Sequence, residues 1–148
     1  YTIGLFCMES FSYDNVIKIS TEIFNKKLEN ILKMDISGGK FIVKDKNEEE
    51  AKVPLKEVTS LARDVCHYCS DLTSEFADIS IGSIGSSAGW SSVITRTKVG
   101  NDLFNKLIND NLVEVKDLAE VKPGFGLVKK ISGIKNSKCK KIEFNVKK

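Results

Sequence analysis

Three cysteines have the types and spacing to bind a metal together. Cys66 and Cys69 form a Cys-x-x-Cys pair, and Cys7 follows the apolar run that opens the chain. Thiolates bind zinc or iron, and a Cys-x-x-Cys turn presents two of them to one ion or cluster. A tetrahedral site needs a fourth ligand, for which Cys139, in a lysine-rich stretch, is a weaker candidate. The alternatives are that Cys7 is a small buried apolar residue and that the pair is redox-active.

The single histidine, His67, lies inside this cysteine pair. In most Cys-x-x-Cys turns this position points away from the metal, so we expect a surface residue or a neighbour of the ligands. The sequence shows no Ser-His-Asp set, no paired carboxylate site and no cluster of acids for a divalent metal. These absences argue against a hydrolase.

A loop rich in glycine and serine follows, within "DISIGSIGSSAGWSS". Glycines let backbone amides approach an anion or a flat ring closely, and serine hydroxyls add donors. The loop is not a P-loop, because no Gly-Lys-Ser/Thr ends it, and its glycine spacing is not that of a dinucleotide fingerprint. Two interpretations stay open: a cofactor loop with Trp90 as an apolar wall and Arg96 as a charge partner, or a wide hairpin with Trp90 in the core.

Composition limits the class of protein. The chain has 148 residues, 41% of them hydrophobic, and a formal net charge of +3. Its excess lysines gather near the end and not among aromatics on a folded face, so we expect no nucleic-acid partner. No apolar run reaches the ~18 residues of a membrane span, and no signal peptide opens the chain. We expect a cytoplasmic protein, and a piece of a longer one, because the sequence opens on a strand without methionine.

The elements that position these residues are short and mixed. Apolar spacing predicts strands over 1–8, 77–84, 90–97 and 112–117, and helices over 14–27, 28–33, 59–63 and 101–111, with a last helix from Pro123. Gly38-Gly39 predicts a hairpin turn, and Pro54 an edge strand. The fold class is therefore α+β or α/β, a small mixed sheet with flanking helices.

Six stretches together resemble one family. "GLFCMESFSY", "KMDISGGKFIV", "VPLKEV", "CHYCSD", "ADISIGSIGSSAGWSSVITRT" and "VKPGFGL" occur in this order. Over about residues 1–130 the chain is similar to the carboxy-terminal part of the coenzyme F420 hydrogenase/dehydrogenase beta-subunit family. We expect a domain over 1–130 and a lysine-rich, solvated tail over 131–148.

The resemblance implies a flavin and iron-sulfur protein of methanogenic archaea. In such proteins electrons pass between a 4Fe-4S cluster, FAD and the deazaflavin coenzyme F420, which is the substrate. The partners that it implies are the other subunits of a hydrogenase or formate dehydrogenase complex. Hydrogen, formate and a membrane chain all remain open as the electron donor, and we expect the fragment alone to be inactive.

Site residues carried over from the family come in two sets. The resemblance makes Cys7, Cys66 and Cys69 cluster ligands, with the fourth ligand upstream of this chain. It places the following residues at the cofactor: Gly82, Ser83, Gly85, Ser86, Gly89, Trp90, Ser91, Thr95 and Arg96. The competing hypotheses are a structural zinc site, with His67 as its fourth ligand, and a non-catalytic subunit-docking module.

Overall fold

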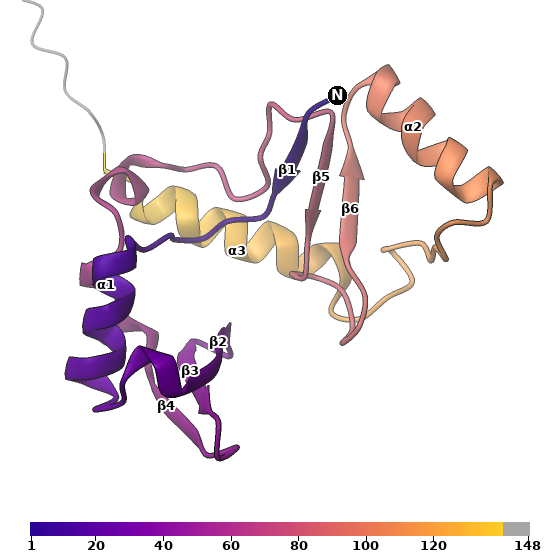
Figure 1. Cartoon of the computed structure of the whole chain (residues 1–148). Coiled ribbons are helices and arrows are strands. Elements are labelled where there is room, and N and C mark those ends of the chain that lie inside the picture. Colours follow the sequence, from indigo (N-terminus) through magenta and orange to yellow (C-terminus); the bar gives the residue numbers. More distant parts are fainter. Residues whose placement is uncertain (141–148) are drawn as a thin grey trace, which may run out of the picture. The chain divides into compact units, whose positions relative to one another are not determined.

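The computed structural model describes residues 1–140, and its elements confirm the α+β class (Figure 1). The chain divides into two compact units. Unit 2 is Glu9–Cys66, and unit 1 combines Tyr1–Met8 with the chain from His67 onward. Each unit has its own three-stranded sheet.

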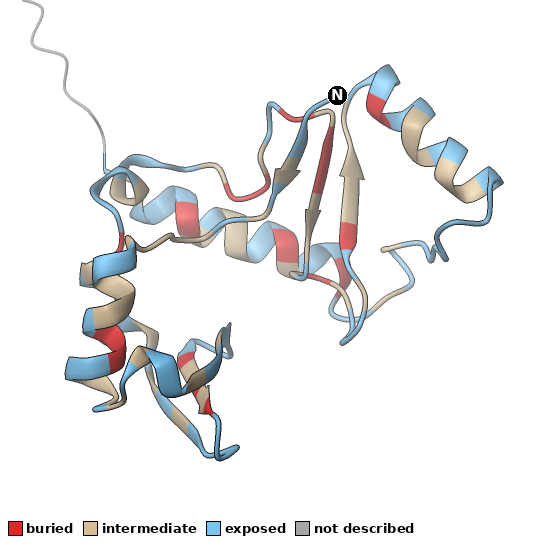
Figure 2. Cartoon of the chain, viewed as in Figure 1, coloured by how far each residue is buried: buried red, intermediate tan, exposed pale blue. Residues whose placement is uncertain are grey.

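Unit 1 contains a mixed sheet in the order β1-β5-β6. Strands β1 (Ile3–Leu5) and β5 (Ile79–Gly82) are parallel, and β5 is antiparallel to β6 (Ser92–Thr95). The buried positions of the sheet are Ile79 and Ser80 in the central strand β5 and Ser92 at the start of β6 (Figure 2). A parallel pair needs a long connection, and here the whole of unit 2 lies within it.

Two helices complete unit 1. Thr97 caps α2 (Lys98–Asn109), its hydroxyl accepting a hydrogen bond from the Gly100 amide at 3.1 Å. Helix α3 (Gly124–Lys138) packs Val128, which is buried, near Gly85 in the loop after β5. The strand expected over 112–117 was wrong, because this segment pairs with no strand in the described chain.

Unit 2 is an antiparallel meander beside a helix. Helix α1 (Tyr13–Lys18) begins after Ser12, whose hydroxyl accepts from the Asn15 amide, and it continues as a π-helical turn, η1 (Ile19–Ile23). Its strands are β2 (Ile31–Ser37), β3 (Lys40–Asp45) and β4 (Glu50–Pro54). The helix expected over 28–33 was wrong. Only a short 3-10 turn, η2 (Leu28–Asn30), forms there, because Ile31 already pairs with Asp45 as part of β2.

The hairpin and the edge strand of unit 2 confirm two predictions. Gly38 and Gly39 have φ of +56° and +73° between β2 and β3, a left-handed conformation that favours glycine. Pro54 ends β4, an edge strand. The core comprises Ile19, Phe41, Val43 and Val58.

Three short 3-10 turns connect β4 with the cysteine pair. They are η3 (Leu55–Glu57), η4 (Thr59–Leu61) and η5 (Asp64–Tyr68). The pair Cys66 and Cys69 therefore lies in and just after η5, where the chain passes from unit 2 to unit 1.

Candidate functional site

The cysteines of unit 1 lie on adjoining segments. Cys7 follows β1, and its amide donates a hydrogen bond to the Leu72 carbonyl at 2.8 Å. Cys69, three residues before Leu72, has its thiol 3.6 Å from the Asp71 carbonyl. Both cysteine side chains are exposed. The fold thus brings Cys7 beside the segment that carries the second cysteine of the pair.

Cys66 belongs to unit 2, where its thiol contacts Ser10. Its sulfur accepts a hydrogen bond from the Ser10 amide at 3.4 Å and lies 3.6 Å from the Ser10 hydroxyl. Within residues 1–140, no three His, Cys, Asp or Glu side chains are placed together so as to hold a metal ion. The assignment of Cys7, Cys66 and Cys69 as ligands stays a prediction, and their thiols have the donor chemistry that iron and zinc require.

The two other predicted neighbours of the pair lie at one place in unit 1. The His67 carbonyl accepts a hydrogen bond from the Lys140 amide at 2.7 Å. Cys139, the residue before Lys140, forms the carboxyl cap of α3. The end of α3 is therefore attached to the Cys-x-x-Cys segment. Residues 131–138 belong to this helix, which therefore crosses the boundary expected at residue 130. The division into a domain and a tail stays a prediction, and 141–148 lie outside the described residues.

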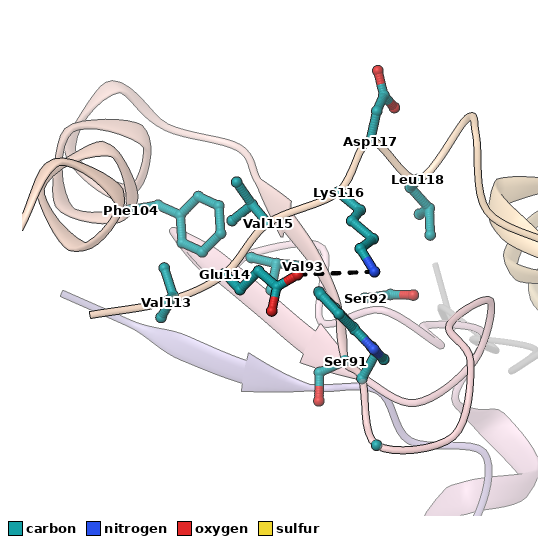
Figure 3. A pocket seen from close by; sticks show the side chains of 12 residues that line it. Ser91, Ser92, Val93, Phe104, Val113, Glu114, Val115, Lys116, Asp117 and Leu118 are labelled. Atoms are coloured by element: carbon teal, nitrogen blue, oxygen red, sulfur yellow. Dashed lines mark ion pairs between the residues drawn. The ribbon is translucent and has the colours of Figure 1, made fainter. Parts of the chain in front are cut away.

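The glycine and serine loop lines an open cavity of about 600 Å³ in unit 1 (Figure 3). Trp90 and Val93 contribute one part of the wall and Phe104 of α2 another. The remainder comes from the segment 113–118, which crosses the cavity. The lining residues are Gly89, Trp90, Ser91, Ser92, Val93, Phe104, Val113, Glu114, Val115, Lys116, Asp117 and Leu118.

A lysine stacks on the tryptophan at this cavity. The Lys116 ammonium lies 4.2 Å from the centroid of the Trp90 ring, a cation–π contact, and 3.9 Å from the Glu114 carboxylate (Figure 3). Trp90 and Lys116 also line an adjoining cavity of about 70 Å³, to which Ser86 and Ser87 contribute. The cavity thus combines aromatic and aliphatic walls with the polar side chains of Ser91, Ser92, Glu114, Lys116 and Asp117, a mixture that a ligand with both apolar and polar parts requires.

Four of the nine loop residues predicted at the cofactor line these two cavities: Gly89, Trp90, Ser91 and Ser86. Their assignment to a cofactor stays a prediction. Ser86 also holds the loop closed, because its hydroxyl bonds to the Ser83 and Trp90 carbonyls at 2.9 and 2.8 Å.

The other five do not themselves line these two cavities. Gly82 packs against Phe6, and Gly85 accepts a hydrogen bond from the Gly124 amide at 2.9 Å. The Arg96 guanidinium donates to the hydroxyls of Ser80 and of Thr73, the second at 2.8 Å. The remaining two are Ser83, which is exposed, and Thr95, whose hydroxyl is 3.5 Å from the Asn101 amide oxygen.

Sequence reasoning missed the segment 113–118 and Phe104. The alternation of Val113 and Val115 was a usable signal, because it marks one apolar side of an extended chain. It was interpreted as a strand, whereas in the structure both valines line the cavity.

The fold and site define an α+β domain with exposed thiols on adjoining segments and an open cavity lined by aromatic, aliphatic and polar side chains. The family model that describes the C terminus of the beta subunit of coenzyme F420 hydrogenase/dehydrogenase matches residues 1–121, and the chain belongs to this family.

Relatives and a solved structure agree with this family. The chain is 43% identical over 141 residues to the coenzyme F420 hydrogenase subunit beta of Methanosarcina barkeri, covering 95% of this chain and 48% of that one. It is 41% identical over 139 residues to the protein of the same name from Methanococcus voltae, covering 94% and 50%. A chain in the F420-reducing [NiFe] hydrogenase complex from Methanosarcina barkeri superposes with a TM-score of 0.88 at 44% identity, covering 93% and 47%.

The chain spans about half the length of these relatives. Among residues 1–140, no helix is both long and apolar enough to cross a membrane.

Proposed function

We propose that the chain is the carboxy-terminal part of a beta subunit that passes electrons between a 4Fe-4S cluster, FAD and coenzyme F420. The observation that supports this most directly is that unit 1 contains two of the three predicted cluster ligands together with the cavity that we assign to the flavin. Cys7 and Cys69 lie on adjoining segments, and the cavity at Trp90 belongs to the same unit. The partners of the whole protein would be the other subunits of a hydrogenase or formate dehydrogenase type complex.

Separate groups of residues would hold the two cofactors. Cys7, Cys66 and Cys69 would supply thiolates to the cluster, with a fourth ligand from outside this chain. Trp90 and Phe104 would contact the flavin ring. When bound, FAD exchanges single electrons with a cluster and a hydride with a deazaflavin.

The cavity residues would act by binding and by excluding water. The aromatic and valine walls remove apolar surface of a ring from water, and the serines at the loop offer hydroxyl and amide donors. Lys116 covers the Trp90 ring, so a flat ligand that stacks on Trp90 has to displace or share this lysine.

The test is the cofactor content of the full-length protein purified without oxygen. About four irons and four acid-labile sulfides per chain are expected, with the loss of both in Cys69→Ser. Cys139→Ser is the matched control and should keep them. One zinc per chain without sulfide would refute the proposal in favour of a structural metal site.

Flavin binding is tested in the same preparations. Replacing Trp90 by alanine should weaken FAD binding by about tenfold, because a buried aromatic contact is lost. Phe125→Ala removes an exposed ring that lines neither cavity and should leave binding unchanged. Equal FAD affinity in the wild type and in Trp90→Ala would refute the flavin site at this cavity.

A further inference from the structure

A lysine side chain is buried beside the cysteine segments of unit 1. Lys135 of α3 is only 5% exposed. Its ammonium donates hydrogen bonds to the Cys7 carbonyl at 2.6 Å and to the Asp71 carbonyl at 2.8 Å. One side chain therefore joins the segment after β1 to the segment after the Cys-x-x-Cys pair.

Neither partner of this ammonium carries a charge. Within residues 1–140, no carboxylate forms an ion pair with Lys135. The Asp71 carboxylate is occupied elsewhere, accepting hydrogen bonds from the Thr73 and Glu75 amides at 3.0 and 2.9 Å. A buried charge is costly unless an opposite charge compensates it, so this position favours an anion nearby.

The groups next to the two acceptors are thiols. Cys7 itself supplies one of the carbonyls, and the Cys69 sulfur lies 3.6 Å from the other, that of Asp71. Thiolates that ligate a metal cluster are negatively charged, so a cluster held by Cys7 and Cys69 would place negative charge beside this ammonium.

We propose that Lys135 is a positioning residue of the cluster site: it ties the Cys7 and Cys69 segments together and places a buried positive charge opposite the thiolates. This inference rests on the proposed function. Reduction adds negative charge to a cluster, and a fixed positive charge stabilises the reduced form. Lys135 therefore raises the midpoint potential of the cluster.

The first test is a redox titration of the full-length protein, monitored by visible and electron paramagnetic resonance spectroscopy. Lys135→Met, which keeps much of the length without the charge, should shift the midpoint to more negative potential. Lys135→Arg should retain most of the wild-type value. Lys130→Met is the matched control, because Lys130 is an exposed lysine of the same helix. A Lys135→Met protein with full iron and sulfide and an unchanged midpoint would overturn the proposal.

A second measurement needs no cluster. In metal-free protein, the rates at which Cys7 and Cys69 react with anionic iodoacetate and with neutral iodoacetamide are compared by mass spectrometry. A local positive charge speeds the anionic reagent selectively, so the ratio of rates should fall by about two- to threefold in Lys135→Met. Loosened packing alone would change both rates together and leave the ratio constant, which would overturn the proposal.

The two measurements distinguish a failure of the proposed function from a failure of the inference about Lys135. If the wild-type protein carries zinc or no metal, the proposed function fails, and the ratio of rates still decides whether Lys135 acts on the thiols. If Lys135→Met loses the cluster altogether, the same ratio decides between lost charge and lost packing.

Discussion

Hydrogen bonds from threonine fix Asp78, the residue before β5. Its carboxylate accepts from the Thr97 hydroxyl at 2.6 Å, and from the Thr2 amide and hydroxyl at 2.8 and 2.9 Å. These bonds hold the pKa of Asp78 below its ordinary range, and the bond from the Thr97 hydroxyl has the largest effect. One carboxylate thereby connects the start of β1 with the cap of α2.

The lowered pKa of Asp78 has a consequence for stability in acid. The carboxylate stabilises the fold at pH values above the unfolded-state pKa of about 3.9, and this stabilisation is lost as pH falls through the lower pKa of the folded state. Asp78→Asn should unfold at lower urea concentration at neutral pH, and the gap to the wild type should narrow toward about pH 3. Asp102→Asn, at an exposed position of α2, is the control and should show no such gap. A gap that stays constant with pH would contradict the role of the charge.

Arg96 shows that the type of a residue does not decide between a structural role and a role in binding. An arginine after a glycine loop is a reasonable partner for an anionic cofactor. In the structure its guanidinium donates to Ser80, which is fully buried, and to Thr73. Sequence cannot distinguish the two roles, because the bonded hydroxyls are 16 and 23 residues away.

At the scale of elements, the loop after β5 is fixed to the start of α3 through glycines. Gly85 has φ of +95°, and a Cβ added there would lie 2.8 Å from both the Gly124 carbonyl oxygen and a methyl of Val128. Gly89 has a similar φ of +83°, but a Cβ there would meet open space. Substitutions at Gly85 and Gly89 therefore distinguish the cost of backbone strain from the cost of a steric clash.

Gly85→Ala should therefore lower the free energy of unfolding more than Gly89→Ala, although both replace a glycine with positive φ. Gly89→Ala should cost about 1–2 kcal/mol of unfolding free energy, from the left-handed backbone alone. Gly85→Ala should cost about 1–3 kcal/mol more, because the added methyl overpacks the contact with α3. Urea unfolding of both variants measures the difference. Equal losses would show that the loop moves away from α3 without cost.

Local sequence can predict a turn, whereas it does not reveal the long-range contacts that make a strand or a cavity. Gly38-Gly39 predicted a hairpin because the turn itself demands positive φ. The segment 112–117 has the alternation of a strand, but a strand also needs a partner, and pairing cannot be inferred from six residues. The same limit applies to the cavity, whose walls come from β6, α2 and the segment 113–118.

The lysine-rich composition around Lys135 obscured its buried position in the sequence. It lies among lysines at the end of the chain, where a solvated role is the ordinary expectation. Its spacing carried the opposite signal, because Gly124, Val128, Ile131 and Lys135 recur at intervals of four, three and four residues. This is the period of one helix face, and Gly124, Val128 and Lys135 on it are buried. A charged residue at a buried position of such a face is a candidate for function.

At the scale of the whole molecule, unit 2 is an insertion whose two ends lie together. Phe11 forms an isolated bridge with Ala62, and the Arg63 amide donates to the Ser10 carbonyl at 2.9 Å. Near the ends of the unit, Ser10 also donates to the Cys66 sulfur. An insertion with adjoining ends can fold without the domain that contains it, provided that its own core is sufficient.

The core of unit 2 supports this independence. Ile19, Val43 and Val58 are fully buried, and the Phe41 ring packs 6.0 Å from the rings of Phe11 and Phe24. All of these residues belong to Glu9–Cys66. The partly buried apolar side chains that pack against this cluster also belong to unit 2.

A peptide of residues 9–66 should therefore fold alone, with a cooperative urea transition and dispersed amide resonances. Phe41→Ala should abolish the transition, because it costs about 3–5 kcal/mol in a domain of marginal stability. Leu32→Ala, at an exposed position of β2, is the matched control and should fold normally. A random-coil spectrum of the wild-type peptide would show that unit 2 depends on contacts outside Glu9–Cys66, and Cys66 would then owe its position to more than Ser10.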